Sequence, residues 1–230
     1  MGEALMFGGG RTVLFNSVFA EESWENIIAA CQSGRVPSTW KIGDQHTLTV
    51  SGTEYMVDII GFNHDDYADG SGKAPITFQM HDISHEYNMH NVSYGNSYSW
   101  ENCNMRKVWL PNLLEQGIPS IKSAVREVTK LTSAGNASST IKATADKLFL
   151  LSEVEVFGTT SMSYAGEGKR YDYYAGGGST IKKQNGSANY WWLRSPYKDS
   201  VDYYVVAYPG GGVGPDSPAS KRGAAFAFCF

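Results

Sequence analysis

The sequence predicts an α+β fold with an antiparallel sheet, in which two or three helices come early and strands close the chain. Residues 119–132, PSIKSAVREVTKLT, repeat their apolar side chains at helical spacing and predict a helix with basic side chains opposite. Residues 46–62 hold two apolar runs separated by Ser51-Gly52, which predicts a hairpin. The closing GAAFAFCF, residues 223–230, alternates Phe with small side chains as a strand does.

Two further helices are expected in the first half. Residues 21–33 repeat Trp, Ile and Cys at helical spacing, with Ser23 as a candidate N-cap and Gly34 as the stop. Residues 99–117 predict a second helix, broken near Pro111 because proline lacks the backbone N–H.

The remaining segments are assigned from alternation and turn residues. Strands are expected at 75–83, near 180–183 and at 201–208, and polar loops at 63–74 and 133–144. Residues 146–158 predict a buried strand followed by a turn, with the carboxylates of Glu153 and Glu155 on one strand face.

Composition excludes several classes of protein. The 230 residues are 42% hydrophobic and 18% charged, which is typical of a folded chain. The net charge is −4 and no basic stripe is present, so we expect no nucleic-acid partner. No run reaches the roughly 18–20 apolar residues of a transmembrane helix, so we expect no membrane insertion. The three cysteines are far apart and are interpreted as buried free thiols.

The beginning of the chain suggests its organisation. Its apolar residues are interrupted by glycines, so it does not read as a secretory signal peptide, and we expect synthesis in the cytoplasm. Residues 1–40 are interpreted as a helix-containing assembly or tether segment, and residues 41–230 as the main domain.

YWWLRSP, residues 190–196, joins bulky aromatic side chains to an arginine and a proline. A segment rich in Gly, Pro, Ser and Asp follows at 197–222, and the last predicted strand comes directly after it. Tyr and Trp provide contact area at little conformational cost, so aromatic side chains among flexible residues are typical of binding surfaces.

Several blocks occur in an order that resembles a known family: IIGFNHDDYADGSGKAPITFQ, KLTSAGNASSTI, DKLFLLSEVEVFG, AGEGKRYDYY, NGSANYWWLRSP and GAAFAFCF. From about Trp24 to Phe230 the chain resembles phage and prophage proteins of gut Firmicutes that carry a domain of unknown function, DUF6273. That resemblance implies a C-type-lectin-like fold, similar to formylglycine-generating enzymes and to the variable proteins of diversity-generating retroelements.

The resemblance divides the C-terminal region into a fixed frame and a variable surface. The implied structural frame consists of Trp191, Trp192, Arg194, Gly223, Phe226 and Phe228, the last three on a return strand that clamps the frame. The implied ligand-binding residues lie in the display segment, 197–222, where they are Tyr197, Asp199, Ser200, Asp202, Tyr204, Val206, Tyr208, Val213, Pro215, Asp216, Ser217 and Ala219. Tyr203 is a further candidate anchor if its side chain faces outward.

Other chemistries fit the sequence less well. His81, His85 and His90 lie in a strand-like context, where a spacing of four residues is too long for one metal ion. The loop with Asp65, Asp66 and Asp69 lacks the spacing of a calcium-binding EF-hand. We therefore expect no metal, no cofactor and no catalytic residue.

The sequence favours a non-enzymatic receptor- or ligand-binding protein, encoded by a phage or prophage. Its expected partner is a bacterial surface protein or a glycan, bound by a virion or at the host-cell surface. Attachment to a virion or assembly as a trimer would add avidity. The alternatives are a structural tail component without a diversified site, and an enzyme on the formylglycine-generating fold.

Overall fold

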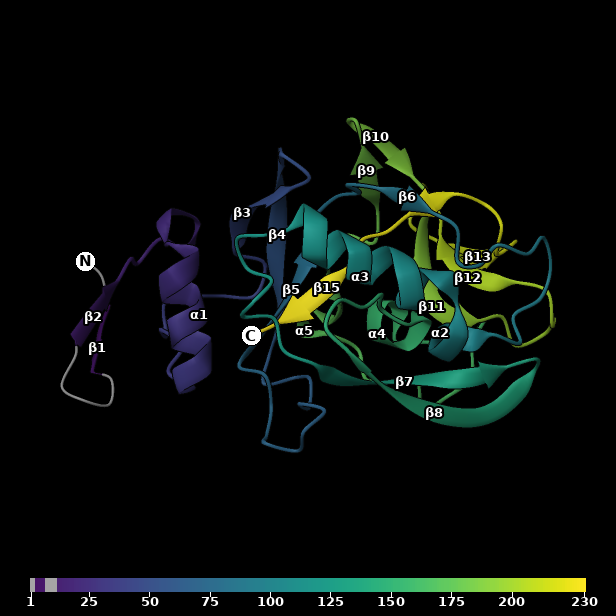
Figure 1. The fold of residues 1–230 in the computed structure, drawn as a ribbon, viewed down its shortest axis with the longest axis horizontal. Coiled ribbons are helices and arrows are strands. Elements are labelled where there is room, and N and C mark those ends of the chain that lie inside the picture. Colours follow the sequence, from purple (N-terminus) through teal and green to yellow (C-terminus); the bar gives the residue numbers. More distant parts are fainter. Residues whose placement is uncertain (1–2, 7–11) are drawn as a thin grey trace.

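The computed structural model describes residues 3–6 and 12–230, which form an antiparallel four-stranded sheet, a mixed five-stranded sheet in which only β11 and β14 run parallel, three separate two-stranded hairpins and short helices (Figure 1). The strands are β1 (Glu3–Met6), β2 (Thr12–Phe15), β3 (Gln45–Val50), β4 (Thr53–Phe62), β5 (Ile76–Met80), β6 (Glu86–Tyr87), β7 (Val128–Gly135), β8 (Ser138–Asp146), β9 (Lys182–Gln184), β10 (Ser187–Asn189), β11 (Trp191–Pro196), β12 (Tyr204–Ala207), β13 (Val213–Asp216), β14 (Arg222–Gly223) and β15 (Ala227–Cys229). The helices are η1 (Phe19–Glu21), α1 (Trp24–Ser33), α2 (Ser99–Asn102), η2 (Met105–Trp109), α3 (Leu110–Asn112), η3 (Leu113–Gly117), α4 (Glu153–Phe157) and α5 (Asp172–Ala175). The expected α+β class with antiparallel sheets is confirmed.

The four-stranded sheet, in the order β15-β5-β4-β3, holds much of the core. Its β3–β4 hairpin turns at Ser51 and Gly52, which both have positive φ angles, as the sequence predicted. The last strand, β15, pairs with β5, so Phe228 stacks on Phe78 with ring centroids 5.3 Å apart. Residues far apart in the sequence therefore close one sheet.

Helix α1 confirms the first predicted helix and both of its ends. The Ser23 hydroxyl accepts a hydrogen bond from the Asn26 N–H, and Gly34 ends the helix with φ of 67°. Trp24 packs on Phe78 of the four-stranded sheet. Part of the expected assembly segment 1–40 thus belongs to the core, while its residues 1–2 and 7–11 lie outside the described residues.

The helix predicted at 119–132 is wrong. Turns occupy its first part, and its last part enters β7, which pairs with β8 in a long hairpin (Figure 1). Residues 128–132 alternate in burial, but two of the three inward positions are polar, Lys130 and Thr132. Because these polar side chains face inward, the period-two pattern of a strand was hidden in the sequence.

Two neighbouring assignments are corrected with it. The loop predicted at 133–144 is mostly the tip of this hairpin and strand β8, with Asn136 and Ala137 turning at φ of 54°. Of residues 146–158, Asp146 ends β8, and the rest contain no strand beyond one bridge between Phe149 and Ala227. Helix α4 begins there instead, at a capping box formed by Ser152 and Glu155.

The second predicted helix is broken, but not by its proline. Helix α2 ends before Cys103, whereas Pro111 lies inside the short helix α3, with the π-helical turns η2 and η3 on either side of it. The wider turns beside it accommodate the absence of a proline N–H, so the helical path does not end at this residue.

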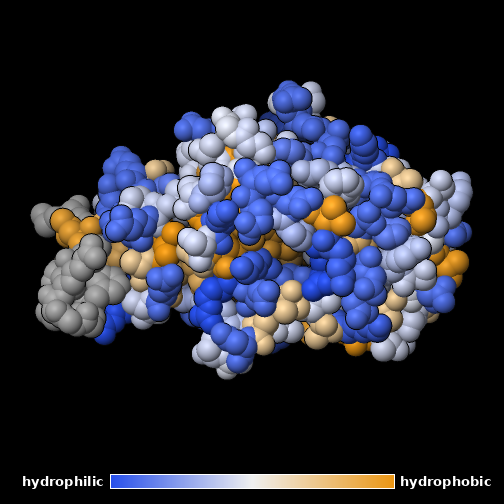
Figure 2. Space-filling model, viewed as in Figure 1, coloured by the Kyte–Doolittle hydropathy of each residue, from blue (hydrophilic) through white to orange (hydrophobic). Residues whose placement is uncertain are grey.

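The arrangement in space separates the N-terminal hairpin from the five-stranded sheet, which has the order β13-β12-β11-β14-β6. Hairpin β1–β2 lies beside α1 at one end of the molecule, and the five-stranded sheet lies toward the other (Figure 1). On the face drawn in Figure 2, hydrophilic side chains dominate and hydrophobic ones occur in small areas. Among the described residues, no helix has the length and apolarity to cross a membrane.

Candidate functional site

Strand β11 carries the aromatic part of the expected frame, and it is completely buried. Trp191 and Trp192 have no exposed surface. The indole N–H of Trp191 donates to the Thr180 carbonyl at 3.0 Å, and that of Trp192 donates to the Tyr87 carbonyl at 2.8 Å. Each tryptophan therefore fixes β11 to a different segment.

Arg194 is the polar centre of the frame. Its buried guanidinium donates to the Thr132 hydroxyl at 2.9 Å and to the carbonyls of Leu131, Leu150 and Glu167. It also forms a bidentate pair with Glu155. Burial alone lowers the pKa of Arg194, but the Glu155 carboxylate raises it above its ordinary value, so the guanidinium stays charged.

The buried charges continue beyond Arg194. The ammonium of Lys130 lies 2.8 Å from Glu155 and 2.7 Å from Asp65. Burial favours the neutral form of both carboxyls, yet the neighbouring cations hold their pKa values below the ordinary range. Glu153 and Glu155 thus lie buried on α4, which corrects their predicted place on one exposed strand face.

Of the other three frame residues, Gly223 and Phe228 lie in two different sheets, and Phe226 lies between their strands. Gly223 pairs with Trp191 in β14, and a Cβ there would lie 2.5 Å from the Ile83 side chain. Phe226 and Phe228 are buried, but β15 pairs with β5 and not with β11. The expected return strand therefore clamps the frame only through Gly223.

The display segment begins in a loop, forms the β12–β13 hairpin and ends at β14. The prediction of a surface position is wrong for two of its residues, because Tyr204 and Val206 have no exposed surface. All four residues of β12 are buried, since the strand is covered on both faces. The Tyr204 hydroxyl donates to the Ser99 carbonyl at 3.1 Å, so this ring packs inward.

The remaining predicted positions reach the surface to different degrees. Exposed residues are Asp199, Pro215 and Ala219; partly exposed residues are Tyr197, Ser200, Asp202, Tyr208, Val213, Asp216 and Ser217. Some of these side chains are already held by the protein. Asp216 accepts from Arg222 at 2.6 Å, and the Tyr208 ring lies over Gly214.

Sequence reasoning missed a second segment on this surface, loop 88–98. Its residue Asn96 is buried, and the amide NH₂ of this side chain donates to the carbonyls of Tyr197, Ser200 and Tyr203 at 3.2, 2.9 and 2.9 Å. The amide oxygen accepts from the backbone N–H of Asn136 at 2.6 Å. One side chain therefore joins loop 88–98, the display segment and the β7–β8 hairpin.

Loop 88–98 also brings aromatic side chains to the display segment. Tyr94 is 65% exposed and meets Tyr203 edge to face, with centroids 6.2 Å apart. Val201 beside them is 45% exposed. The signal in the sequence was the tyrosine-containing polar run NVSYGNSY, which matches no catalytic or metal motif.

Residues 76–224, more than half of the chain, match the family described as a domain of unknown function (DUF6273). The chain belongs to this family. The match confirms that part of the expected resemblance; it includes the display segment and ends before Phe226 and Phe228. No curated protein and no solved structure matches the chain.

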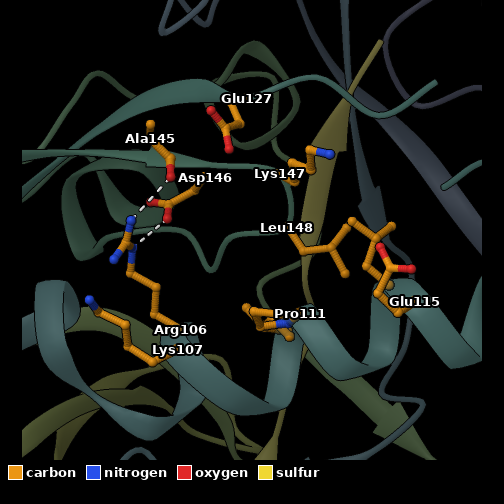
Figure 3. A pocket seen from close by; sticks show the side chains of 11 residues that line it. Arg106, Lys107, Pro111, Glu115, Glu127, Ala145, Asp146, Lys147 and Leu148 are labelled. Atoms are coloured by element: carbon orange, nitrogen blue, oxygen red, sulfur yellow. Dashed lines mark hydrogen bonds and ion pairs between the residues drawn. The ribbon is translucent and has the colours of Figure 1, made fainter. Parts of the chain in front are cut away.

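This DUF6273 protein also has a pocket of about 390 Å³ between helices η2 to η3 and the end of β8 (Figure 3). Leu148 and Pro111 face its centre, and charged side chains surround them. Arg106 is held by Asp146 at 2.5 Å and by the Ala145 carbonyl, so its polar atoms are engaged within the protein. The positive and negative side chains that line the pocket are equal in number, so the pocket favours neither an anionic nor a cationic ligand.

The residues considered for metals bind other protein groups. Asp65, Asp66 and Asp69 pair with Lys130, Lys73 and Arg126, respectively. His81 lies 2.9 Å from Asp58, and that hydrogen bond raises its pKa. Over residues 3–6 and 12–230, no group of three or more His, Cys, Asp or Glu side chains is arranged to hold a metal ion. All three cysteines are buried and unpaired, as the sequence predicted.

Proposed function

We propose that this DUF6273 protein is a non-enzymatic binding protein that recognises a macromolecule on a bacterial surface. The binding surface consists of the display segment, 197–222, and loop 88–98. The observation that carries this proposal is the preorganisation of that surface by Asn96. Fixed loops with exposed tyrosines lose little conformational freedom on binding, which favours affinity.

The buried frame supports a finer proposal. A phage or prophage encodes the protein on a C-type-lectin-like fold, and a diversity-generating retroelement varies its display segment. The side chains of Arg194 and the two tryptophans are bound by other segments, so exposed substitutions after residue 196 leave their contacts unchanged. Attachment to a virion or formation of a trimer supplies avidity.

Binding to cells tests the proposed surface. Fluorescently labelled protein is added to a panel of intact gut Firmicutes, and bound fluorescence is measured by flow cytometry. Tyr203→Ala should weaken binding roughly 10- to 30-fold, as for a central aromatic anchor. Val108→Ala is the matched control, because Val108 is also exposed but lies on η2. Equal binding by both variants, or no binding to any strain, contradicts the proposal.

Population sequencing tests the diversification separately. Amino-acid changes should concentrate at exposed positions such as Asp199, Asp202 and Pro215, and should spare the buried Tyr204 and Val206. Changes spread evenly over exposed positions of the whole gene contradict the retroelement, even where cell binding is retained.

A further inference from the structure

The exposed corner between Tyr94 and Tyr203 has two aromatic walls beside an acidic stretch of the chain. The two rings meet at 78°, with their centroids 6.2 Å apart. Asp202 precedes Tyr203, and its carbonyl accepts from the Gly95 N–H at 3.1 Å, so its backbone lies against loop 88–98. The corner therefore draws on both segments of the proposed surface.

The backbone around this corner is held in place. The N–H of Asn96 donates to the Val201 carbonyl at 2.6 Å, and its side chain binds the Tyr203 carbonyl. These bonds fix the main chain on both sides of the two rings. Tyr94 still leaves 65% of its surface exposed, so solvent reaches its ring. A rigid and accessible aromatic side chain is suited to contact a partner.

The unpaired charges beside the corner are negative. The carboxylates of Asp199 and Asp202 have no cationic partner among the described residues. The nearest lysine in the sequence, Lys198, donates its ammonium to the Thr160 carbonyl. Aromatic faces attract cations through the ring quadrupole, and a free carboxylate adds to that attraction.

We propose that Tyr94, Tyr203 and Asp202 bind a cationic side chain, arginine or lysine, of a protein partner. The inference rests on the proposed binding function and names the chemistry of its partner. A guanidinium in the corner stacks on a tyrosine face and turns an N–H edge toward the carboxylate. Tyr94 lies outside the segment expected to vary, so its part of the contact is common to all display variants, whereas Tyr203 and Asp202 lie within that segment.

The probe is the capped peptide acetyl-Gly-Arg-Gly-amide, titrated into ¹⁵N-labelled full-length protein and followed by NMR. The comparison peptide has citrulline in place of arginine, which keeps the shape and removes the charge. We expect saturable shifts at the amides of Tyr94, Gly95 and Tyr203, and binding about tenfold weaker for citrulline. Equal binding of the two peptides, or shifts elsewhere only, overturns the proposal.

Variants separate the ring from the carboxylate. Tyr94→Phe should retain arginine binding. Tyr94→Leu keeps apolar area but removes the aromatic face, and should weaken arginine binding about fivefold. Asp202→Asn should weaken binding and reduce its salt dependence. Each variant must keep the wild-type thermal midpoint, and a loss seen equally for Phe and Leu contradicts a role for the aromatic face.

The two proposals fail in different ways. A protein that binds cells but does not distinguish arginine from citrulline retains the proposed function and loses the cationic partner. If a neutral saccharide titrated in place of the peptides binds this corner more tightly than arginine does, the cationic partner is likewise lost and the target is a glycan. A protein that prefers arginine but binds no cell loses the proposed function, and the corner then has another partner.

Discussion

The carboxyl of Glu167 provides a direct test of the buried polar network. It is fully buried, accepts a hydrogen bond from the Ser133 N–H at 2.8 Å, and is bound by the Ser195 hydroxyl. Burial raises its pKa from 4.5 to about 7. The change Glu167→Gln mimics the protonated acid, because its amide can accept from Ser133 and donate to Ser195.

The sign and size of the effect follow from linkage. Between pH 4.5 and about 7 the folded state holds a proton that the unfolded state has released, so stability falls as the pH rises. A pKa difference of that size corresponds to a loss of about 3 kcal/mol from this one group. The contribution of Glu167 is fully present below pH 4.5 and absent above about pH 7.

Urea unfolding of wild type and Glu167→Gln at several pH values between about 4.5 and 8.5 measures this effect. The stability of the variant relative to wild type should rise by about 3 kcal/mol up to neutral pH and then level off. Because the histidines are the same in both proteins, their contribution to the pH dependence cancels in this difference. Glu54→Gln, at an exposed carboxylate, is the control and should give a flat difference. A flat or falling difference for Glu167→Gln would refute the reasoning.

Three further predictions concern stability and surface order. Arg194→Met leaves Glu155 buried without its bidentate partner and should cost about 3–5 kcal/mol in chemical unfolding, with partial recovery on adding Glu155→Gln. Asn96→Ala removes the hydrogen bonds to three carbonyls and one N–H. It should lower the free energy of unfolding by about 2–3 kcal/mol and speed hydrogen exchange in loop 88–98, and unchanged exchange would contradict the role of Asn96 in ordering that loop. Gly214→Ala places a Cβ 1.8 Å from the Tyr208 hydroxyl and should lower the thermal midpoint, whereas adding Tyr208→Ala should restore it.

Local patterns predicted the elements that follow simple rules. Helix α1 has a serine cap and a terminal glycine, and the β3–β4 hairpin has Ser51-Gly52 at its turn, so both could be read from a few residues. Strand β7 could not, because its inward positions hold Lys130 and Thr132. Their partners, Asp65 and Arg194, lie far away in the sequence, and only the folded chain brings them together.

The candidate surface was predicted in part for a similar reason. Composition pointed to 197–222, but alternation alone could not show that β12 is covered on both faces and hides Tyr204 and Val206. Loop 88–98 joins that surface through the hydrogen bonds of Asn96, about a hundred residues before their acceptors in the chain. No local motif encodes such a contact.

The position of β15 has a consequence for how variants survive in a cell. This strand closes the four-stranded sheet beside β5, and the ring of Phe228 stacks on Phe78 at its centre. A chain that stops anywhere between residues 197 and 222 lacks this strand, leaves β5 with an open apolar edge, and is exposed to aggregation and proteolysis. Premature stop codons in the display segment therefore give truncated chains that aggregate or are degraded. Exposed substitutions that keep the reading frame leave the core intact.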